Sequence, residues 1–557
     1  MPRDRHTRPG WAAWSTGATW GRRFAVAVSA VTVAYLGGVS ATSLAPTTAR
    51  TQHYRAELRL SPLPQQTSTI HSPTSLGDID LEFTSLLPAP GMDVTIQTRA
   101  NITDLFNERA VSVRSLQPSQ RELTDALTGA AWRMARTFSL GALAAAAISL
   151  ALIAVGRRRR PRARHFAVLG LSALIAVLGT GVAVWDSYQP GKLSHFRTTG
   201  LLGTLRRNAG LLAHVESRAQ QVTPYVTNLL ALSQALQDKF VPPNVNEPAA
   251  ARFLLVSDIH GANAYPFMAT IIKDEHITAV IDSGDLLNLG SVTEAEAAGI
   301  FRSIAGLGVP YLFARGNHDA SGSRDTSLRR RLARIPNVVL LQPNTSSYVQ
   351  ASVAGVTVSG FDDPRYFGDD SQQTAAKQRP AIDAYNRSYA GRPRPDIVVS
   401  HEPAAVQGVA EAGLRVNGHL HKEELDGNRI GVGTFTGGGI LGHLVPGGTD
   451  GEMVDQPYAF DIAVFGERCD LTSLTRYSYR NLIGGRPAYD DVTVINGATI
   501  AGEAPPGRTC SPELGPTATS FPAVPPPAPS PQSATPASPS ASLQPNAPAT
   551  PASTSTP

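Results

Sequence analysis

Short apolar runs that end in residues able to bind metal constrain the fold of this chain more than any other feature. The first is Arg252–Val256, a mostly apolar run typical of a buried strand, and Asp258 and His260 follow it at once. Side chains two residues apart in an extended segment point the same way, as a chelating pair requires. In a mostly parallel α/β sheet, ligands bind at the carboxyl ends of strands. On its own, however, this pair fits a polar turn better than a metal site.

The same pattern occurs four more times. Further apolar runs lead into Ser283–Asn288, Arg315–Asp319, His401–Pro403 and Gly418–His421. The five runs together present seven candidate ligands: Asp258, His260, Asp285, Asn317, His401, His419 and His421. Mixed nitrogen and oxygen ligands suit Mn, Fe or Zn better than calcium. Seven ligands exceed the need of one ordinary transition-metal site and are enough for two ions that share a bridging carboxylate.

The ordered set Asp-x-His, Gly-Asp-x-x-Asn, Gly-Asn-His-Asp, His and Gly-His-x-His resembles the calcineurin-like metallophosphoesterase family. The resemblance covers residues 251 to about 480, less than half of the chain. It implies an α/β fold, a four-layer α/β/β/α sandwich, with two divalent metal ions. It also implies hydrolysis of a phosphate mono- or diester by attack of a hydroxide that bridges the two ions.

The resemblance also implies a role for each matched residue. Asp285 would bridge the two ions. The other ligands would be Asp258, His260 and His421 for one ion, and Asn317, His401 and His419 for the other. His318 matches the catalytic histidine of the family and is expected to protonate the leaving oxygen.

One departure from the family pattern argues against one class of substrate, the phosphoproteins. The protein serine/threonine phosphatase branch reads Gly-Asp-x-x-Asp-Arg-Gly, whereas residues 284–290 read Gly-Asp-Leu-Leu-Asn-Leu-Gly. Asn288 therefore replaces the carboxylate that orients the histidine in that branch, and the phosphate-binding arginine is missing. We do not expect a phosphoprotein phosphatase.

Three charge-free apolar segments precede the motifs, at residues 24–44, 138–156 and 166–185. Each has about the 20 residues that cross a bilayer. The first follows a basic stretch, so it is either an uncleaved helix, which we favour, or a cleaved signal peptide. None of the three contains Asp, Glu, Lys, Arg or His, which argues against a transport path and for an anchor.

The arginine-rich loop at 157–165 sets the expected topology. Between two spanning helices, such a loop indicates the cytoplasmic side rather than a nucleic-acid site. We therefore expect a multi-pass protein of the cell membrane whose catalytic domain is extracytoplasmic. The expected order is a cytoplasmic N-terminus (1–23), an extracytoplasmic region (45–137) with half-exposed strands at 78–83 and 93–97, the cytoplasmic loop (157–165), a helical stalk and linker (186–250) and the metallophosphoesterase domain (251–500).

Smaller features complete the expectations. Residues 292–307 and 324–335 have helical composition, 428–436 and 458–465 are expected to close a second sheet, and the polar insertion 365–395 is expected to cap the site. The Pro/Ala/Ser/Thr-rich segment 511–557 predicts a disordered tail. Cys469 and Cys510, the only two cysteines, are expected to pair in an oxidising compartment.

Membrane attachment makes a phosphoester from lipid or the cell envelope the expected substrate, with the bilayer as the other partner and no nucleic acid. The alternative is a non-catalytic, membrane-anchored binding or sensor module that retains the phosphatase fold. A decayed site usually loses ligands, and here all seven are present, so the pattern favours an enzyme.

Overall fold

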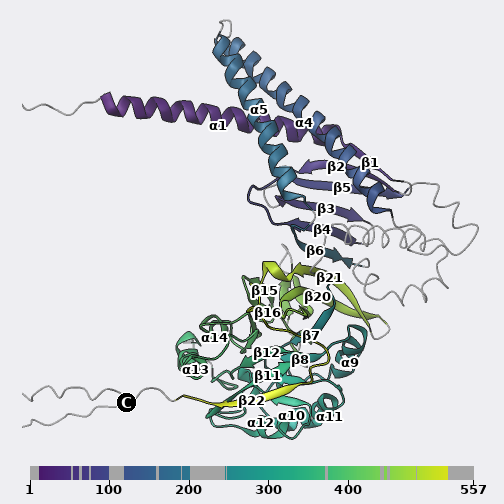
Figure 1. Ribbon diagram of the computed structural model, residues 1–557, viewed down its shortest axis with the longest axis vertical. Helices are drawn as coiled ribbons and strands as arrows, with labels where there is room; N and C mark the ends of the chain where they lie inside the picture. Colours follow the sequence, from purple (N-terminus) through teal and green to yellow (C-terminus); the bar gives the residue numbers. More distant parts are fainter. Residues whose placement is uncertain are drawn as a thin grey trace, which may run out of the picture.

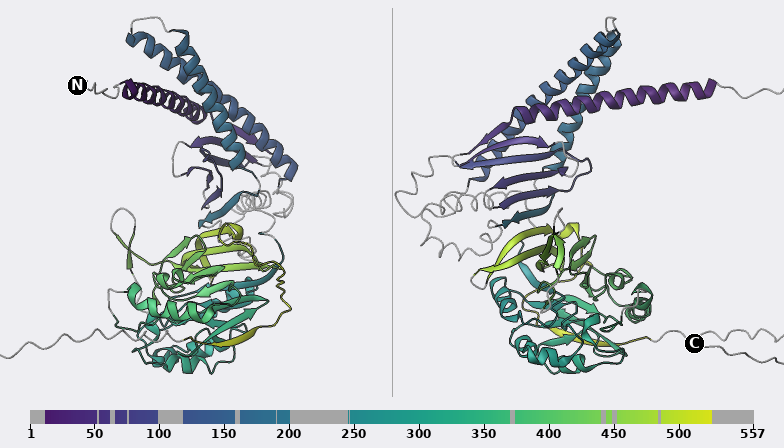
Figure 2. Two further views of the ribbon diagram at one scale, coloured as in Figure 1. Left: turned by 60° about the vertical axis from the view of Figure 1, so that its left-hand side comes forward. Right: turned by 180° about the vertical axis from the view of Figure 1, so that it is seen from behind.

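The computed structural model describes residues 12–51, 54–61, 66–74, 77–98, 118–157, 162–189, 191–200, 245, 247–369, 374–439, 444–447, 452–483 and 486–524. Three long helices and a small β-sheet region form one end of the molecule, and an α/β sandwich forms the other (Figures 1 and 2). A single sheet of 13 strands runs through both parts.

The three helices are α1 (Ala12–Leu44), α4 (Gln120–Arg157) and α5 (Ala163–Ser187). Their segments Gly21–Leu44, Gln120–Gly156 and Ala163–Ser187 are long and apolar enough to cross a membrane. The expected spans lie inside these segments. Helix α4 begins well before residue 138, so the last part of the region expected outside the membrane, up to residue 137, is the first half of this helix.

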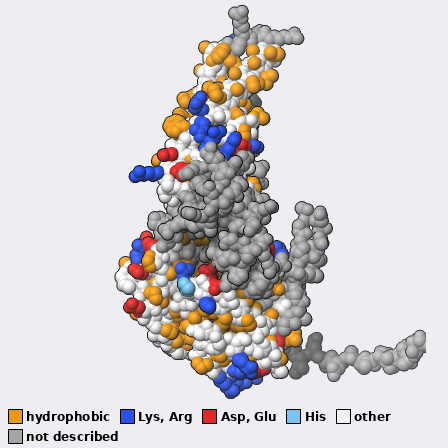
Figure 3. Space-filling view, turned by 90° about the vertical axis from the view of Figure 1, so that its right-hand side faces the viewer, with side chains coloured by type: hydrophobic (Ala, Val, Ile, Leu, Met, Phe, Trp, Pro, Cys, Tyr) orange, Lys and Arg blue, Asp and Glu red, His pale blue; other side chains and the backbone are white. Residues whose placement is uncertain are grey.

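Small residues let the helices pack closely. A Cβ on Gly141 of α4 would lie 2.4 Å from the carbonyl oxygen of Gly37 in α1, so the two backbones touch. Such small-residue contacts are typical of helix pairs in membranes. On the outside, large apolar side chains such as Phe24, Val155 and Trp185 are more than 70% exposed. Orange side chains accordingly cover the helical end of the molecule in Figure 3, as lipid contact requires.

The sheet region beside the helices contains six strands. They are β1 (Thr47–Arg50), β2 (Tyr54–Ser61), β3 (Thr69–Thr74), β4 (Gly77–Phe83), β5 (Gly91–Thr98) and β6 (Leu193–Thr199). Strands β4 and β5 confirm the two strands expected at 78–83 and 93–97. Strand β6 corrects the expected helical stalk at 186–250, because residues 193–199 pair with β4 on one side and with β21 (Arg486–Asn496) on the other. Most of the expected stalk, 201–244, lies outside the described residues.

The first sheet continues from β6 into the sandwich in the order β21, β20 (Leu471–Ile483), β19 (Tyr458–Gly466), β7 (Ala249–Val256), β8 (Ala279–Asp282), β9 (Tyr311–Phe313) and β10 (Val338–Leu340). Strands β7 to β10 are parallel, and β19 runs antiparallel to β7. The expectation that 458–465 closes the second sheet is therefore wrong. A strand has the same sequence pattern whether it pairs with the first or with the second sheet. The pattern alone therefore did not show which sheet residues 458–465 join.

The second sheet has the order β15 (Glu423–Asp426), β16 (Arg429–Val432), β14 (Leu414–Asn417), β13 (Ile397–Val399), β12 (Val356–Gly360), β11 (Ser347–Val353) and β22 (Thr517–Pro522). Strands β17 (Leu444–Gly447) and β18 (Glu452–Asp455) form a separate hairpin. Strand β22 corrects the tail expected to be disordered from 511, because 517–522 pair with β11. Residues 525–557 lie outside the described residues.

Alternation along the strands produces the four layers. Phe253 and Leu255 of β7 face the second sheet and pack with residues such as Val399. Leu254 and Val256, one residue out of phase, pack against helices on the other face. These helices are α9 (Tyr265–Asp274), α10 (Val292–Ala297), α11 (Ile300–Ala305) and α12 (Ser327–Leu332); α13 (Thr374–Tyr389) and α14 (Pro403–Gln407) cover the second sheet. The expected α/β/β/α sandwich is confirmed.

The structure also tests the predictions for the 365–395 insertion and for the two cysteines. The insertion at 365–395 is not one long loop, since α13 occupies its middle and packs into the core through Ile382 and Tyr385. The Cys469–Cys510 disulfide is present. It ties the turn between β19 and β20 to the segment that leads into β22.

Candidate metal centre

The candidate ligands lie just beyond the carboxyl ends of strands from both sheets. Parallel strands bring these ends to one edge of each sheet, and the two edges lie at the same end of the sandwich. In the order β7, β8, β9, β13 and β14, the residues that follow the strands are Asp258 with His260, Asp285, Asn317, His401, and His419 with His421.

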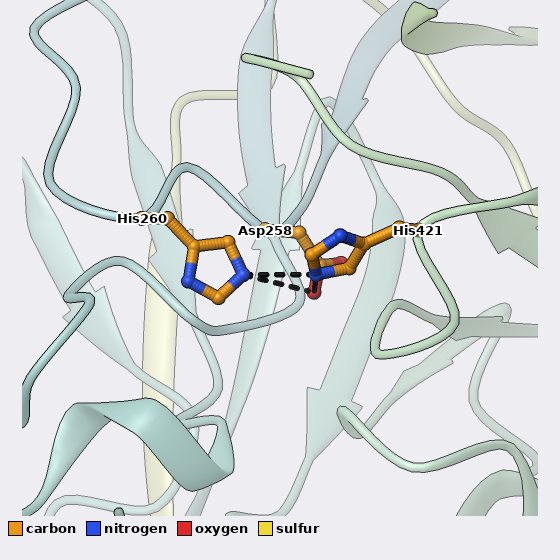
Figure 4. A group of neighbouring side chains, drawn as sticks. All are labelled: Asp258, His260 and His421. Atoms are coloured by element: carbon orange, nitrogen blue, oxygen red, sulfur yellow. Dashed lines mark hydrogen bonds and ion pairs between the residues drawn. The ribbon is translucent and has the colours of Figure 1, made fainter. Parts of the chain in front are cut away.

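One group consists of Asp258, His260 and His421, whose ligand atoms lie within 4.8 Å of one another. The Nε2 atoms of His260 and His421 are 2.9 Å apart. The Oδ1 atom of Asp258 is 3.2 Å from Nε2 of His421 and 3.8 Å from Nε2 of His260. Figure 4 shows the two rings and the carboxylate turned toward one another. A group of this kind could hold one metal ion.

A second group consists of Asp285, His401 and His419. The Oδ2 atom of Asp285 lies 3.0 Å from Nε2 of His401 and 3.9 Å from Nε2 of His260. Asp285, a member of the second group, therefore also lies close to His260 of the first group.

Backbone strain is concentrated here. Positive φ angles, between 47° and 72°, occur at Asp258, His260, Asp285, His419 and His421. A non-glycine residue in this region costs of order 1–3 kcal/mol and persists only where surrounding structure enforces it. Close approach also explains a motif glycine, since a Cβ on Gly418 would lie 2.5 Å from Oδ2 of Asp258.

His318 lies at the edge of the cluster. Its ring forms a third group with His260 and Asp285, and the centroids of the His260 and His318 rings are 4.9 Å apart. The main-chain N–H of His318 donates to Oδ1 of Asp285 at 2.7 Å. The ring of Phe367 lies on another side of His318, with centroids 5.4 Å apart. The 365–395 segment therefore reaches the site through Phe367.

Asn317 provides a test of whether the cluster fits a cation. Its side-chain oxygen Oδ1 is buried and has no hydrogen-bond partner among the described residues. A buried amide oxygen without a partner costs about 1–3 kcal/mol. The next residue, His318, donates a main-chain hydrogen bond to Asp285, so Asn317 lies beside the candidate ligand Asp285. A cation bound by Asp285 would give the oxygen of Asn317 a partner. The residues present fit a metal ion.

Comparison with known proteins identifies this region. Residues 251–427 match the family model of the calcineurin-like phosphoesterases. This part of the chain is a calcineurin-like phosphoesterase domain. Domains of this family use divalent metal ions, so the domain is that of a metal-dependent phosphoesterase, as expected. No curated protein matches the sequence.

Solved structures with a similar fold include a dimetal phosphatase from Danio rerio, with 11% sequence identity over 45% of this chain and 100% of that chain and a TM-score of 0.27. A purple acid phosphatase from yellow lupin (Lupinus luteus) seeds has 16% identity over 46% of this chain and 55% of its own, with a TM-score of 0.27. The anchor in the inner membrane complex of Plasmodium has 11% identity over 44% of this chain and 88% of its own, with a TM-score of 0.30. These likenesses carry no conclusion about the substrate of this chain.

The protonation states of the candidate ligands in the phosphoesterase domain favour binding of a cation. Burial raises the pKa of Asp285, but the charge of His401, its hydrogen bond to Asp285 and the charge of His260 together lower this pKa to about 2. Burial also raises the pKa of Asp258, while hydrogen bonds with His260 and His421 hold it well below the usual range. Both carboxylates are therefore ionised at neutral pH, although they are buried. Burial lowers the pKa of His419 to about 4, which leaves a neutral imidazole able to bind metal.

Hydrogen bonds from neighbouring residues hold the candidate ligands in place. The carboxylate of Asp319 accepts hydrogen bonds from the main-chain N–H groups of Asp285, Leu287 and Gly316. Nδ1 of His421 donates a hydrogen bond to the side-chain oxygen of Gln456 at 3.2 Å. Such contacts fix the orientation of the ligand rings and tune their basicity.

A buried ion-pair network lies beside the second group. Arg365 contacts the carboxylates of Asp363 and Glu402 at 2.6 and 2.7 Å. Oε2 of Glu402 in turn lies 3.2 Å from Nε2 of His419. The sequence motifs did not point to Arg365, Asp363 or Gln456. The one available signal was the position of Glu402, directly after His401.

Proposed function

We propose that this chain is a membrane-anchored phosphoesterase that uses two divalent metal ions to hydrolyse a phosphate mono- or diester outside the cytoplasm. The observation that carries the proposal is the position of Asp285 between two groups of ligands that come from both sheets. One group alone would fit a single ion. Two groups that share a carboxylate favour two ions, and their nitrogen and oxygen donors favour Mn, Fe or Zn.

Each residue then has a role. Asp258, His260 and His421 would hold one ion, Asn317, His401 and His419 would hold the other, and Asp285 would serve both. Two divalent ions at this place would stabilise negative charge on the phosphoryl oxygens and acidify the attacking water. His318, which is held at the edge of the cluster, donates a proton to the leaving oxygen.

The connectivity of the helices supports the location. Residues 44, 120 and 187, where α1 ends, α4 begins and α5 ends, all lead to the sheet region (Figure 1). The start of α1, the end of α4 and the start of α5 are the opposite ends of these helices. If the arginine-rich loop is cytoplasmic, as its charge favours, the sheet region and the catalytic domain are both outside. The disulfide agrees with this side, because disulfides persist in oxidising compartments.

Membrane attachment favours a substrate that comes from lipid or the cell envelope. The rival proposal, a non-catalytic binding or sensor module with the same fold, has less support, since the sequence retains every residue of the proposed ligand set. Metal and activity measurements separate the two proposals.

The test uses the full chain in detergent, with Asp285→Asn as the altered protein. Glu296→Gln is the matched control, since Glu296 lies on α10, half exposed and paired with Arg331. We expect two metal ions per wild-type and control chain and hydrolysis of simple phosphate esters that chelation abolishes and Mn, Fe or Zn restores. Asp285→Asn should lose both metal and activity. Metal binding without turnover of any mono- or diester would favour the sensor instead.

A further inference from the structure

A cavity of about 760 Å³ opens beside the candidate metal centre. Its volume falls within the range of about 300–1,000 Å³ typical of small-molecule pockets. Residues from α9, from the segment after β16, and from β19 and β20 line it. Those that matter here are Phe267, Thr270, Phe435, Tyr458, Tyr479 and Arg480.

The cavity shares a wall with the metal centre. Gly439 lines it, and a Cβ added at Gly439 would lie 2.3 Å from the Cβ of His260. Thr436, also in the lining, donates from Oγ1 to the main-chain carbonyl of Ile259 at 2.9 Å. The cavity therefore adjoins the segment that carries His260.

Four of the twelve described lining residues are aromatic, and they form two stacked pairs. Tyr458 stacks on Tyr479, with ring centroids 5.1 Å apart and ring planes 15° apart. Phe267 stacks on Phe435 in the same way, at 5.7 Å and 14°. Phe435 and Tyr479 are buried, whereas Phe267 and Tyr458 are only partly buried and are the surfaces that a ligand would contact.

Little net charge lies at the cavity. No carboxylate occurs among the described lining residues. The one charged lining residue is Arg480, which is about half exposed and pairs with Asp490 at 3.2 Å. The cavity therefore presents aromatic rings beside polar groups such as Asn263 and Thr270, and its guanidinium is already paired with a carboxylate.

We propose that this cavity is the subsite for the apolar chain of a lipid phosphoester whose phosphate lies at the metal centre. The proposal rests on the proposed function and adds the substrate class to it. The chain itself carries three helices able to span a bilayer, so a membrane lipid is the apolar phosphoester that the domain meets at highest local concentration.

Non-hydrolysable phosphonates test the subsite by binding rather than turnover. Titration calorimetry on the metal-loaded full chain in nanodiscs would compare methyl-, hexyl- and phenylphosphonate. Full burial of one methylene is worth about fourfold in affinity, so a partly buried chain should make hexylphosphonate bind at least about tenfold tighter than methylphosphonate.

Variants on helix α9 locate the effect. Thr270→Trp fills the cavity and should abolish the preference for hexylphosphonate, whereas Ala269→Trp, which places the same side chain on the exposed side of the helix, should keep it. Phe267→Ala removes a wall and should reduce the preference at least about threefold, so the test survives if Thr270→Trp does not fold.

The binding results separate a failure of the proposed subsite from a failure of the proposed function. Equal affinity for methyl- and hexylphosphonate, or equal loss of the preference in Thr270→Trp and Ala269→Trp, overturns the subsite but leaves the proposed function intact. Tighter binding of phenylphosphonate than of hexylphosphonate overturns the lipid chain in favour of an aromatic substrate. A protein that binds neither metal nor methylphosphonate overturns the proposed function and the subsite together.

Discussion

The ring nitrogen Nδ1 of His318 lies 2.7 Å from the main-chain carbonyl oxygen of Asn288. A carbonyl oxygen only accepts hydrogen bonds, so Nδ1 carries the proton and Nε2 is the nitrogen available to a substrate. Asn288 is the position at which a related branch of the family uses a side-chain carboxylate. Here the main chain of the same residue orients the ring.

This geometry predicts the behaviour of His318→Asn. The variant should keep its metal, because the proposed ligands are untouched, and its kcat on a simple alkyl phosphate should fall by about 10²–10⁴-fold, the usual contribution of a positioned acid. The loss should be smaller for p-nitrophenyl phosphate, whose leaving group hardly needs a proton. Steady-state kinetics with both esters, together with metal analysis, would decide it. Loss of metal, or equal loss on both esters, would remove His318 from the role of acid.

Asn288→Ala is the matched comparison for the orienting contact. Because the carbonyl belongs to the main chain, the substitution keeps it, and we expect a decrease in kcat of no more than about tenfold. The same two esters measure it. A decrease as large as that of His318→Asn would mean that the Asn288 side chain, rather than its carbonyl, is required.

The sandwich and the gathering of its ligands could be predicted from sequence because the signal is local. Each strand is short and apolar, and each ligand follows it directly, as Asp258 follows β7. Parallel strands then bring distant segments to one edge without any further information. The roles of individual residues, such as the bridging role of Asp285, stay predictions.

Strand pairing over long distances was not predictable in the same way. Strand β6 joins two sheet regions, and β22 adds an edge strand from a segment rich in Pro, Ala, Ser and Thr. In β22 only Phe521 is buried, so there is no alternation to detect. The supporting contacts were missed for a similar reason, since Gln456 reaches His421 from 35 positions away.

The proposed topology makes a prediction about accessibility. Leu86, in the sheet region, is 94% exposed, and Arg164, at the start of α5 and so at the other end of the helices, is exposed as well. On intact cells, a membrane-impermeant maleimide should label Leu86→Cys directly and Arg164→Cys only after permeabilisation. The native cysteines do not interfere, because they are paired. The opposite labelling would place the catalytic domain in the cytoplasm.

The disulfide should stabilise the edge of the second sheet. Cys469 and Cys510 are buried and 41 residues apart in sequence, and Cys510 lies seven residues before β22. Closing a loop of this length typically contributes about 2–4 kcal/mol to the free energy of unfolding. Cys469→Ser combined with Cys510→Ser should therefore lower Tm and make the chain near β22 sensitive to protease. Reduction of the wild-type protein should reproduce both effects, and an unchanged Tm would contradict the prediction.

A buried acid gives the stability a defined pH dependence. Asp282, at the end of β8, is fully buried, and it accepts hydrogen bonds from the hydroxyl of Tyr311 and the N–H of Gly284. Burial raises the pKa of Asp282 well above its usual value. In the unfolded chain this carboxyl loses its proton near pH 4. Above that pH the folded state holds one more proton than the unfolded state, so stability falls as pH rises toward the folded pKa.

Asp282→Asn removes this penalty, because an amide has no proton to lose and retains a similar shape. Each pH unit between the unfolded and folded pKa values costs the wild type up to about 1.4 kcal/mol. The Tm of Asp282→Asn minus that of the wild type should therefore become more positive from pH 5 to pH 8. Thermal unfolding of the detergent-solubilised chain at fixed metal concentration measures this difference. Asp383→Asn, at an exposed carboxylate on α13, should follow the wild type throughout. A difference that stays constant or shrinks with rising pH would show that Asp282 is ionised in the folded protein.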